Sequence, residues 1–112
     1  MNLTIENIII NASAGEALSF EGGTNTLVLS GTNSFTSPAS CAGIAVEGVT
    51  VLTISGSGKC TAQGGNNSAG IGGGYWTDAG TINIQSGNIY ATGGNSAAGI
   101  GLQLRHTNAE IC

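Results

Sequence analysis

Short apolar stretches recur along the chain, and within most of them apolar residues alternate with polar ones. A first set lies at residues 3–5, 27–29, 52–54 and 82–84, a second at residues 10–12, 35–37, 60–62 and 89–91, and a third is centred on Leu18, Ile44, Ile71 and Ile100. Apolar residues two positions apart are typical of a strand with one buried face. Members of the first set begin 24, 25 and 30 positions apart. The three sets therefore predict a repeating unit of three short strands.

A unit of this kind cannot bury its apolar face alone, whereas a stack of units can. We therefore expect an all-β chain that forms a right-handed parallel β-helix (β-solenoid) of about four coils, with three short strands per coil. The coils are expected over residues 1–102, and an irregular tail or cap over residues 103–112. An up-and-down antiparallel sheet is the alternative. The Ser-Gly pairs that recur at residues 30–31, 55–56 and 86–87 suit the corner of a coil better.

Stacked coils place equivalent side chains over one another, about 4.8 Å apart. The predicted interior ladders are Leu3/Leu27/Leu52/Ile82, Ile5/Leu29/Ile54/Ile84, Ile10/Phe35/Cys60/Ile89, Ala12/Ser37/Ala62/Ala91 and Leu18/Ile44/Ile71/Ile100. Residues 64–68 and 93–97 are near copies that mark a further corner, since Gly and Asn tolerate the positive φ that such corners require. Asn66 and Asn95 within these copies are expected to stack between coils and to hydrogen-bond there.

Composition and charge narrow the classes of partner. Charged residues make up 7% of the chain and the net charge is −4, with Lys59 and Arg105 as the only Lys or Arg residues. A nucleic-acid partner is not expected, because such proteins need a basic surface to displace counterions from phosphates. Membrane insertion is not expected either, since no apolar run approaches the length of a membrane span. The first residues lack the pattern of a signal peptide, and we expect the sequence to be a fragment of a longer protein.

Metal ligands and catalytic groups are sparse and scattered. Cys41, Cys60 and Cys112 show no paired spacing of the kind that zinc sites use, and His106 does not complete one. Glu21 and Glu47 follow equivalent strands one coil apart, so they are weak candidates for a shared calcium ion; no other cofactor is expected. Arg105 and His106 are neighbours without an identifiable base or nucleophile, and catalysis needs positioned groups. We predict that the chain is not an enzyme.

Several repeated phrases resemble a known family. They lie at residues 52–58, 61–65, 68–74, 91–94 and 98–101. These phrases resemble the coils of bacterial carbohydrate-binding domain-containing proteins of the right-handed parallel β-helix type, over roughly residues 2–102. The resemblance implies an extracellular or cell-surface setting in the parent protein, non-catalytic binding of a polysaccharide, and in some cases bound calcium. No binding motif of that family can be matched to individual residues of this chain.

The loop over residues 72–80 lengthens one coil and contains the only Trp of the chain. Insertions in solenoids become surface loops, frequently on the binding side, and aromatic rings offer stacking faces to sugars. The candidate carbohydrate-binding residues are therefore Tyr75, Trp76 and Asp78 in this loop, Tyr90, which is predicted to point outward from a strand, and the corner residues Asn66 and Asn95. Alternatively, Trp76 folds over a coil corner as a lid.

Two other roles remain open, a structural stalk or adhesin repeat without a small ligand and a polysaccharide lyase remnant. Both ends of a four-coil stack would expose unpaired strand edges and apolar rungs, and open edges invite pairing with another chain. We therefore expect homo-oligomers that form through the coil ends.

Overall fold

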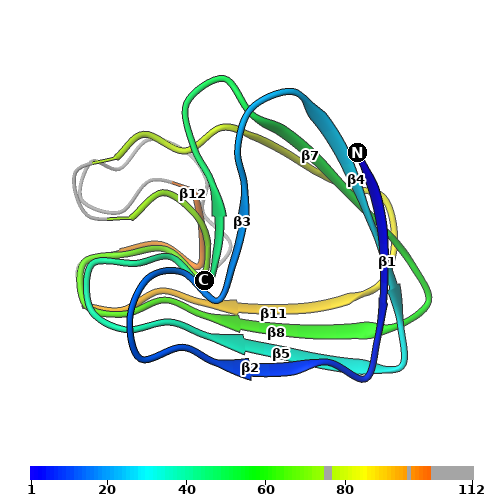
Figure 1. Ribbon diagram of the computed structural model, residues 1–112, viewed down its shortest axis with the longest axis horizontal. Helices are drawn as coiled ribbons and strands as arrows, with labels where there is room; N and C mark the ends of the chain where they lie inside the picture. Colours follow the sequence, from blue (N-terminus) through cyan, green and yellow to red (C-terminus); the bar gives the residue numbers. More distant parts are fainter. Residues whose placement is uncertain (75–76, 96, 102–112) are drawn as a thin grey trace.

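The computed structural model describes residues 1–74, 77–95 and 97–101, and all regular structure in these ranges is β-strand. The chain winds through four coils, and each coil contributes one strand to each of three sheets (Figure 1). Sheet A contains β1 (Asn2–Glu6), β4 (Thr24–Ser30), β7 (Val51–Gly56) and β10 (Thr81–Ile84). Sheet B contains β2 (Ile9–Asn11), β5 (Thr32–Thr36), β8 (Lys59–Gln63) and β11 (Asn88–Thr92). Sheet C contains β3 (Leu18–Phe20), β6 (Ile44–Val46), β9 (Ile71–Gly72) and β12 (Ile100–Gly101).

The predicted fold class is confirmed: the protein is a right-handed parallel β-helix with three strands per coil. Every pair of neighbouring strands in the three sheets is parallel. The antiparallel alternative is therefore wrong, and the antiparallel pairing among the described residues is an isolated bridge between Glu47 and Ala79. The predicted tail, residues 103–112, lies outside the described residues. No helix in the described part of the chain is long and apolar enough to cross a membrane.

The core fills the space between the three sheets. Alternation turns every second side chain inward, and the inward residues of the two middle coils are the most completely buried; they include Leu27, Leu29, Phe35, Ile44, Leu52, Ile54, Cys60 and Ile71. Burying one such aliphatic or aromatic side chain contributes about 1.5 to 3 kcal/mol. The stability of the fold therefore comes from contacts between coils, because no coil encloses its own apolar residues.

The predicted ladders are correct between coils one and two and between coils three and four. In sheet A, Leu3 pairs with Leu27 and Ile82 pairs with Leu52. The same holds in sheet B, where Ile89 pairs with Cys60. Sheet C matches the prediction over all four coils.

The predicted register between coils two and three is wrong by two residues in sheets A and B. Leu27 pairs with Ile54 and not with Leu52. Phe35 likewise pairs with Ala62 and not with Cys60. A slip of two positions keeps every side chain on its own face of the sheet, so the alternation of apolar residues does not distinguish the two registers.

The true register brings two asparagines into the interior, Asn25 opposite Leu52 and Asn33 opposite Cys60. Asn33 is 0% exposed; its Nδ2 donates to the carbonyls of Ser30 (3.1 Å) and Lys59 (3.2 Å), and its Oδ1 accepts the backbone N–H of Ile8 (2.9 Å). Asn33 thus connects coil two to both neighbouring coils. Buried amides of this kind are tolerated because their polar atoms have partners.

Asn25 has a similar role at the start of β4. Its Nδ2 donates to the carbonyl oxygens of Gly22, Gly23 and Val51 at 3.1, 3.3 and 3.2 Å. The Val51 carbonyl belongs to coil three, so this amide also holds consecutive coils together.

Candidate functional site

Three turns lie on consecutive coils where the chain passes from sheet B to sheet C: two β-turns at residues 38–41 and 65–68, and a third turn closed by the hydrogen bond from Ala97 to Gly94. In each turn the carbonyl of the first residue accepts the N–H of the fourth, at 3.1, 3.1 and 3.2 Å. Ser40 and Asn67, the third residues of the first two turns, have φ of 69° and 62°. Positive φ at the third residue is the feature of a type II turn, and Asn accepts it readily.

The turns are hydrogen-bonded to one another in the same way as the strands. Ser40 donates its N–H to the carbonyl of Asn66 (3.1 Å), and Asn67 donates to the carbonyl of Asn95 (3.0 Å). A second pair of bonds joins Gly65 N–H to Cys41 and Gly94 N–H to Ser68, each at 3.0 Å. We call this arrangement, formed by residues 38–41 and 65–68 together with Gly94, Asn95 and Ala97, the turn ladder.

The glycines of the turn ladder are required by close approach. A Cβ on Gly65 would overlap the carbonyl of Pro38 and lie 2.6 Å from the Cα of Ala39, and a Cβ on Gly94 would overlap the carbonyl of Gly65. Neither glycine has a positive φ. The near copies at residues 64–68 and 93–97 mark a corner, as predicted. The reason expected for Gly65 and Gly94 is wrong, however: these glycines do not supply left-handed backbone but leave room for the turns to stack.

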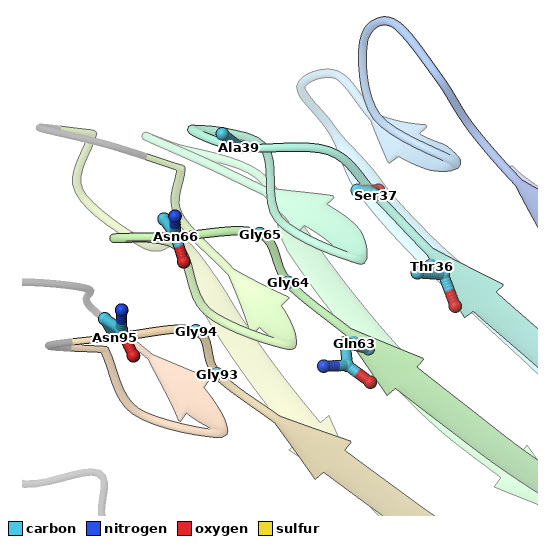
Figure 2. A pocket seen from close by; sticks show the side chains of 10 residues that line it. All are labelled: Thr36, Ser37, Ala39, Gln63, Gly64, Gly65, Asn66, Gly93, Gly94 and Asn95. Atoms are coloured by element: carbon cyan, nitrogen blue, oxygen red, sulfur yellow. The ribbon is translucent and has the colours of Figure 1, made fainter.

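An open groove of about 510 Å³ runs beside the turn ladder over coils two to four (Figure 2). Its lining consists of Thr36, Ser37, Ala39, Gln63, Gly64, Gly65, Asn66, Gly93, Gly94 and Asn95. None of these residues carries a charge. Asn66 and Asn95 occupy the second position of consecutive turns with their side chains exposed, and Figure 2 shows Asn66 above Asn95 on the neighbouring coil. Their equivalent in coil two is Ala39.

Sheet B supplies the other polar side chains of the groove. Thr36 pairs with Gln63, and Gln63 pairs with Thr92, so the three last residues of β5, β8 and β11 form one outward row. Thr36 and Gln63 were not predicted from the sequence, because outward polar residues of a strand resemble any solvated face. One signal was present: each residue of this row precedes the first residue of a turn by two positions.

Tyr90 lies on the outer face of sheet B, as predicted, with 56% of its surface exposed. It pairs with Thr61, and Thr92, two positions further along β11, pairs with the groove residue Gln63. The ammonium nitrogen of Lys59 lies 5.1 Å from the centre of the Tyr90 ring, a cation–π contact. On the outer face of sheet B, Tyr90 and Thr61 are thus the neighbours of the Thr92–Gln63 pair, which lies at the groove.

Asp78, the other candidate residue that the structure describes, does not join this surface. Asp78 is exposed on the loop between sheets C and A, where its carbonyl accepts the N–H of Gly48 (3.1 Å), and it does not line the groove. Tyr75 and Trp76 lie outside the described residues. Of the predicted binding residues within the described ranges, the structure therefore brings together Asn66 and Asn95, with Tyr90 nearby.

The two calcium candidates follow paired strands, since Phe20 pairs with Val46 and Glu21 and Glu47 are the next residues. Glu47 Oε2 accepts the N–H of Gly74 (2.9 Å), and Glu21 Oε2 accepts the hydroxyl of Ser19 (3.4 Å). Calcium takes six to eight oxygen ligands. In the described ranges no group of three or more His, Cys, Asp or Glu residues could hold a metal ion, so this pair alone gives no basis for a calcium site.

The two described cysteines are free thiols. Burial raises the pKa of Cys60 to about 11. Burial, followed by the negative charge of Glu16, also raises the pKa of Cys41. A thiol with a raised pKa is a weak nucleophile at neutral pH, and Cys60 serves as a core residue.

The fold and the groove define the class: a short right-handed β-solenoid with an uncharged polar groove at one corner. Comparison of the chain with protein-family models, curated proteins and solved structures finds no match. The resemblance to carbohydrate-binding β-helix proteins therefore depends on the repeated phrases of the sequence alone.

Proposed function

We propose that this chain is a non-catalytic polysaccharide-binding module and that the groove beside the turn ladder is its binding surface. The observation that carries the proposal is the repetition of exposed amide side chains, Asn66 and Asn95, on consecutive coils of an uncharged groove. Each amide has two donor hydrogens and an acceptor oxygen, which suits hydroxyl groups. A polymer with repeated hydroxyl groups matches a surface that repeats about every 4.8 Å.

The row Thr36, Gln63 and Thr92 extends this surface toward Tyr90. Amide and hydroxyl groups supply further hydrogen bonds, and the exposed ring of Tyr90 supplies an apolar face for the C–H groups of a sugar. The contact with Lys59 favours a fixed orientation of the ring. Together these side chains offer the combination of polar contacts and one aromatic face that sugar recognition uses.

The absence of titratable side chains from the groove lining supports a binding role over catalysis. General acid–base or nucleophilic catalysis needs a positioned group of suitable pKa, and the described lining residues offer only amides, hydroxyls and backbone. The same property disfavours the lyase alternative. The proposal includes an extracellular or cell-surface position in a bacterial parent protein, which the sequence resemblance supports.

The test is a glycan array followed by titration calorimetry on the best glycan. The double variant Asn66→Ala/Asn95→Ala should weaken binding between about fivefold and about a hundredfold, because two hydrogen bonds contribute about 0.5 to 1.5 kcal/mol each. Alanine fits these positions, since Ala39 occupies the equivalent position in coil two. The matched control is Asn83→Ala, an exposed asparagine of sheet A.

Two results would contradict the proposal. If the wild type binds no glycan on the array, the stalk or adhesin role is favoured instead. If the double variant binds as tightly as the wild type and the control, a glycan-binding surface exists elsewhere on the chain.

A further inference from the structure

We propose that the polysaccharide held beside the turn ladder is an uncharged polymer whose chain runs along the axis of the solenoid, so that successive sugars meet successive coils. This inference rests on the proposed function and adds to it the class of polymer and the direction of its chain. The other direction, along the strands and across the groove, would confine a sugar chain to the side chains of one coil.

Two rows of polar groove residues run parallel to the axis. The first row contains Thr36 and Gln63, which pair across β5 and β8, and the second contains Asn66 and Asn95, at equivalent positions of consecutive turns. Hydrogen bonds between neighbouring coils set the step within each row, which is about 4.8 Å. A polymer that lies along the axis therefore meets uncharged donors and acceptors at a regular step.

A strip of glycines separates the two rows. Residues 64–65 lie between Gln63 and Asn66, and the strip continues on the next coil at residues 93–94 (Figure 2). Gln63 and Asn66 are exposed, whereas the two glycines between them are buried or partly buried. A chain along the axis can lie on this strip with a polar row on either side, whereas a chain across the groove would have to pass over both rows.

The distribution of cations favours an uncharged polymer. The groove lining carries no charge, and Lys59 is the only Lys or Arg in the described ranges. Lys59 precedes Gln63 by four positions on β8, about 13 Å along an extended strand. Its ammonium nitrogen lies over the Tyr90 ring, 5.1 Å from the centre. The described lining therefore offers no cationic partner to an anionic polymer.

Negative charge close to the turn ladder has the same effect. Burial, and then the negative charges of Glu16 and Glu47, raise the pKa of Cys41, the last residue of the first turn. Both carboxylates therefore act on the turn that contributes Ala39 to the groove. Carboxylate or sulfate groups of a polymer would be repelled at this end of the groove, whereas hydroxyl groups would not.

The axial direction makes affinity depend on the length of the sugar chain. The groove extends over coils two to four, so its polar groups span two steps, about 10 Å. An oligosaccharide too short to reach from Thr36 in coil two to Asn95 in coil four would lose the contacts at one end. Affinity should therefore rise with length until both residues are contacted, and then stay constant.

The first test addresses the charge of the polymer. An array carries neutral polysaccharides (β-glucan, mannan, arabinoxylan and dextran) and anionic ones (alginate, polygalacturonate and heparin). The wild type should bind neutral polysaccharides alone, and carboxymethylation of the best of them should weaken binding by about tenfold or more. An anionic polysaccharide bound as tightly as the best neutral one would overturn the inference. Absence of all binding would overturn the proposed function as well.

The second test addresses the direction of the chain, by titration calorimetry with oligosaccharides of increasing length from the best neutral polysaccharide. Thr36→Val and Asn95→Ala alter residues two coils apart. Each variant should weaken binding of the long oligosaccharides by about twofold to tenfold, the effect of one lost hydrogen bond. For the shortest oligosaccharide that binds, at most one of the two should matter. Thr53→Val makes the matched change on the outer face of sheet A and should bind like the wild type.

Far-UV circular dichroism checks that the three variants are folded. The axial direction is overturned if no oligosaccharide is sensitive to both Thr36→Val and Asn95→Ala, or if affinity does not depend on length. In either case a loss of affinity in Asn66→Ala/Asn95→Ala would still support the groove as the binding surface, so the two proposals fail separately.

Discussion

Asn67 donates its backbone N–H to the carbonyl oxygen of Asn95, 3.0 Å away, and thereby fixes the turn of coil three on the turn of coil four. A loop at this corner is therefore held by the same hydrogen bonding that holds the sheets. For this reason the exposed side chains of Asn66 and Asn95 start from well-defined backbone positions. Such preorganisation reduces the entropy lost when a ligand binds.

The turn ladder should be sensitive to any side chain at its glycines. Gly65→Ala would place a Cβ against the backbone of Pro38 and Ala39, and overpacking of this kind costs about 1 to 3 kcal/mol. Urea unfolding should show the loss as a lower midpoint. The neighbouring variant Asn66→Ala is the control and should change the free energy of unfolding by less than about 0.5 kcal/mol. Equal stability of Gly65→Ala and the wild type would contradict the close stacking of the turns.

Asn33 should be among the most important polar residues for stability. Asn33→Ala removes the partners of Ile8 N–H and of the carbonyls of Ser30 and Lys59. A buried polar group left without a partner costs about 1 to 3 kcal/mol, so we expect at least that loss in denaturant unfolding. Asn11→Ala, at an exposed position of β2, is the control. A loss no larger than that of the control would show that Asn33 does not link the coils.

Cys60 should make stability depend on pH in the alkaline range. Burial raises its pKa from 9.0 to about 11, so above pH 9 the unfolded chain loses the thiol proton while the folded chain keeps it. The contribution is complete below pH 9 and is lost as the pH rises toward 11, by about 2 to 3 kcal/mol. The measurement is urea unfolding of the wild type and Cys60→Ala across this range. The wild type should lose more stability than the variant; parallel curves would contradict the burial of the thiol.

The aromatic ring of Tyr90 should matter for binding and little for folding. If sugar stacks on this ring, Tyr90→Ala weakens glycan binding by about tenfold, whereas Tyr90→Phe keeps the ring and most of the affinity. The side chain is 56% exposed, so thermal unfolding should change only slightly in either variant. Glycan binding that is insensitive to Tyr90→Ala would confine the binding surface to the groove itself.

The sequence was sufficient to predict the architecture because three independent sets of strands repeat together. It did not predict the register between coils two and three, since a slip of two positions leaves the inward and outward faces unchanged. The offset of 27 positions between Ile44 and Ile71 was visible in the third set. Applied to the other two sets, the same offset pairs Leu27 with Ile54 and Phe35 with Ala62, as the structure has them.

The candidate site was predicted only in part. Asn66 and Asn95 could be found because they occur in near copies, and copies stack in a solenoid. The sequence did not predict that Asp78 lies away from Asn66 and Asn95. Its loop connects sheet C to sheet A, whereas the two asparagines lie at the corner between sheets B and C. Gln63 was missed because an outward polar residue carries no sign of a groove until the loops of neighbouring coils are known.

The uniform offset between coils two and three has a consequence for the evolution of such chains. It is 27 positions in all three sheets, as in the pairs Leu27–Ile54, Phe35–Ala62 and Ile44–Ile71. A tandem duplication of 27 codons in this region would therefore insert one complete coil without changing which side chains face inward. Unequal recombination could lengthen or shorten the solenoid by whole coils, and each coil gained would bring one more turn to the ladder.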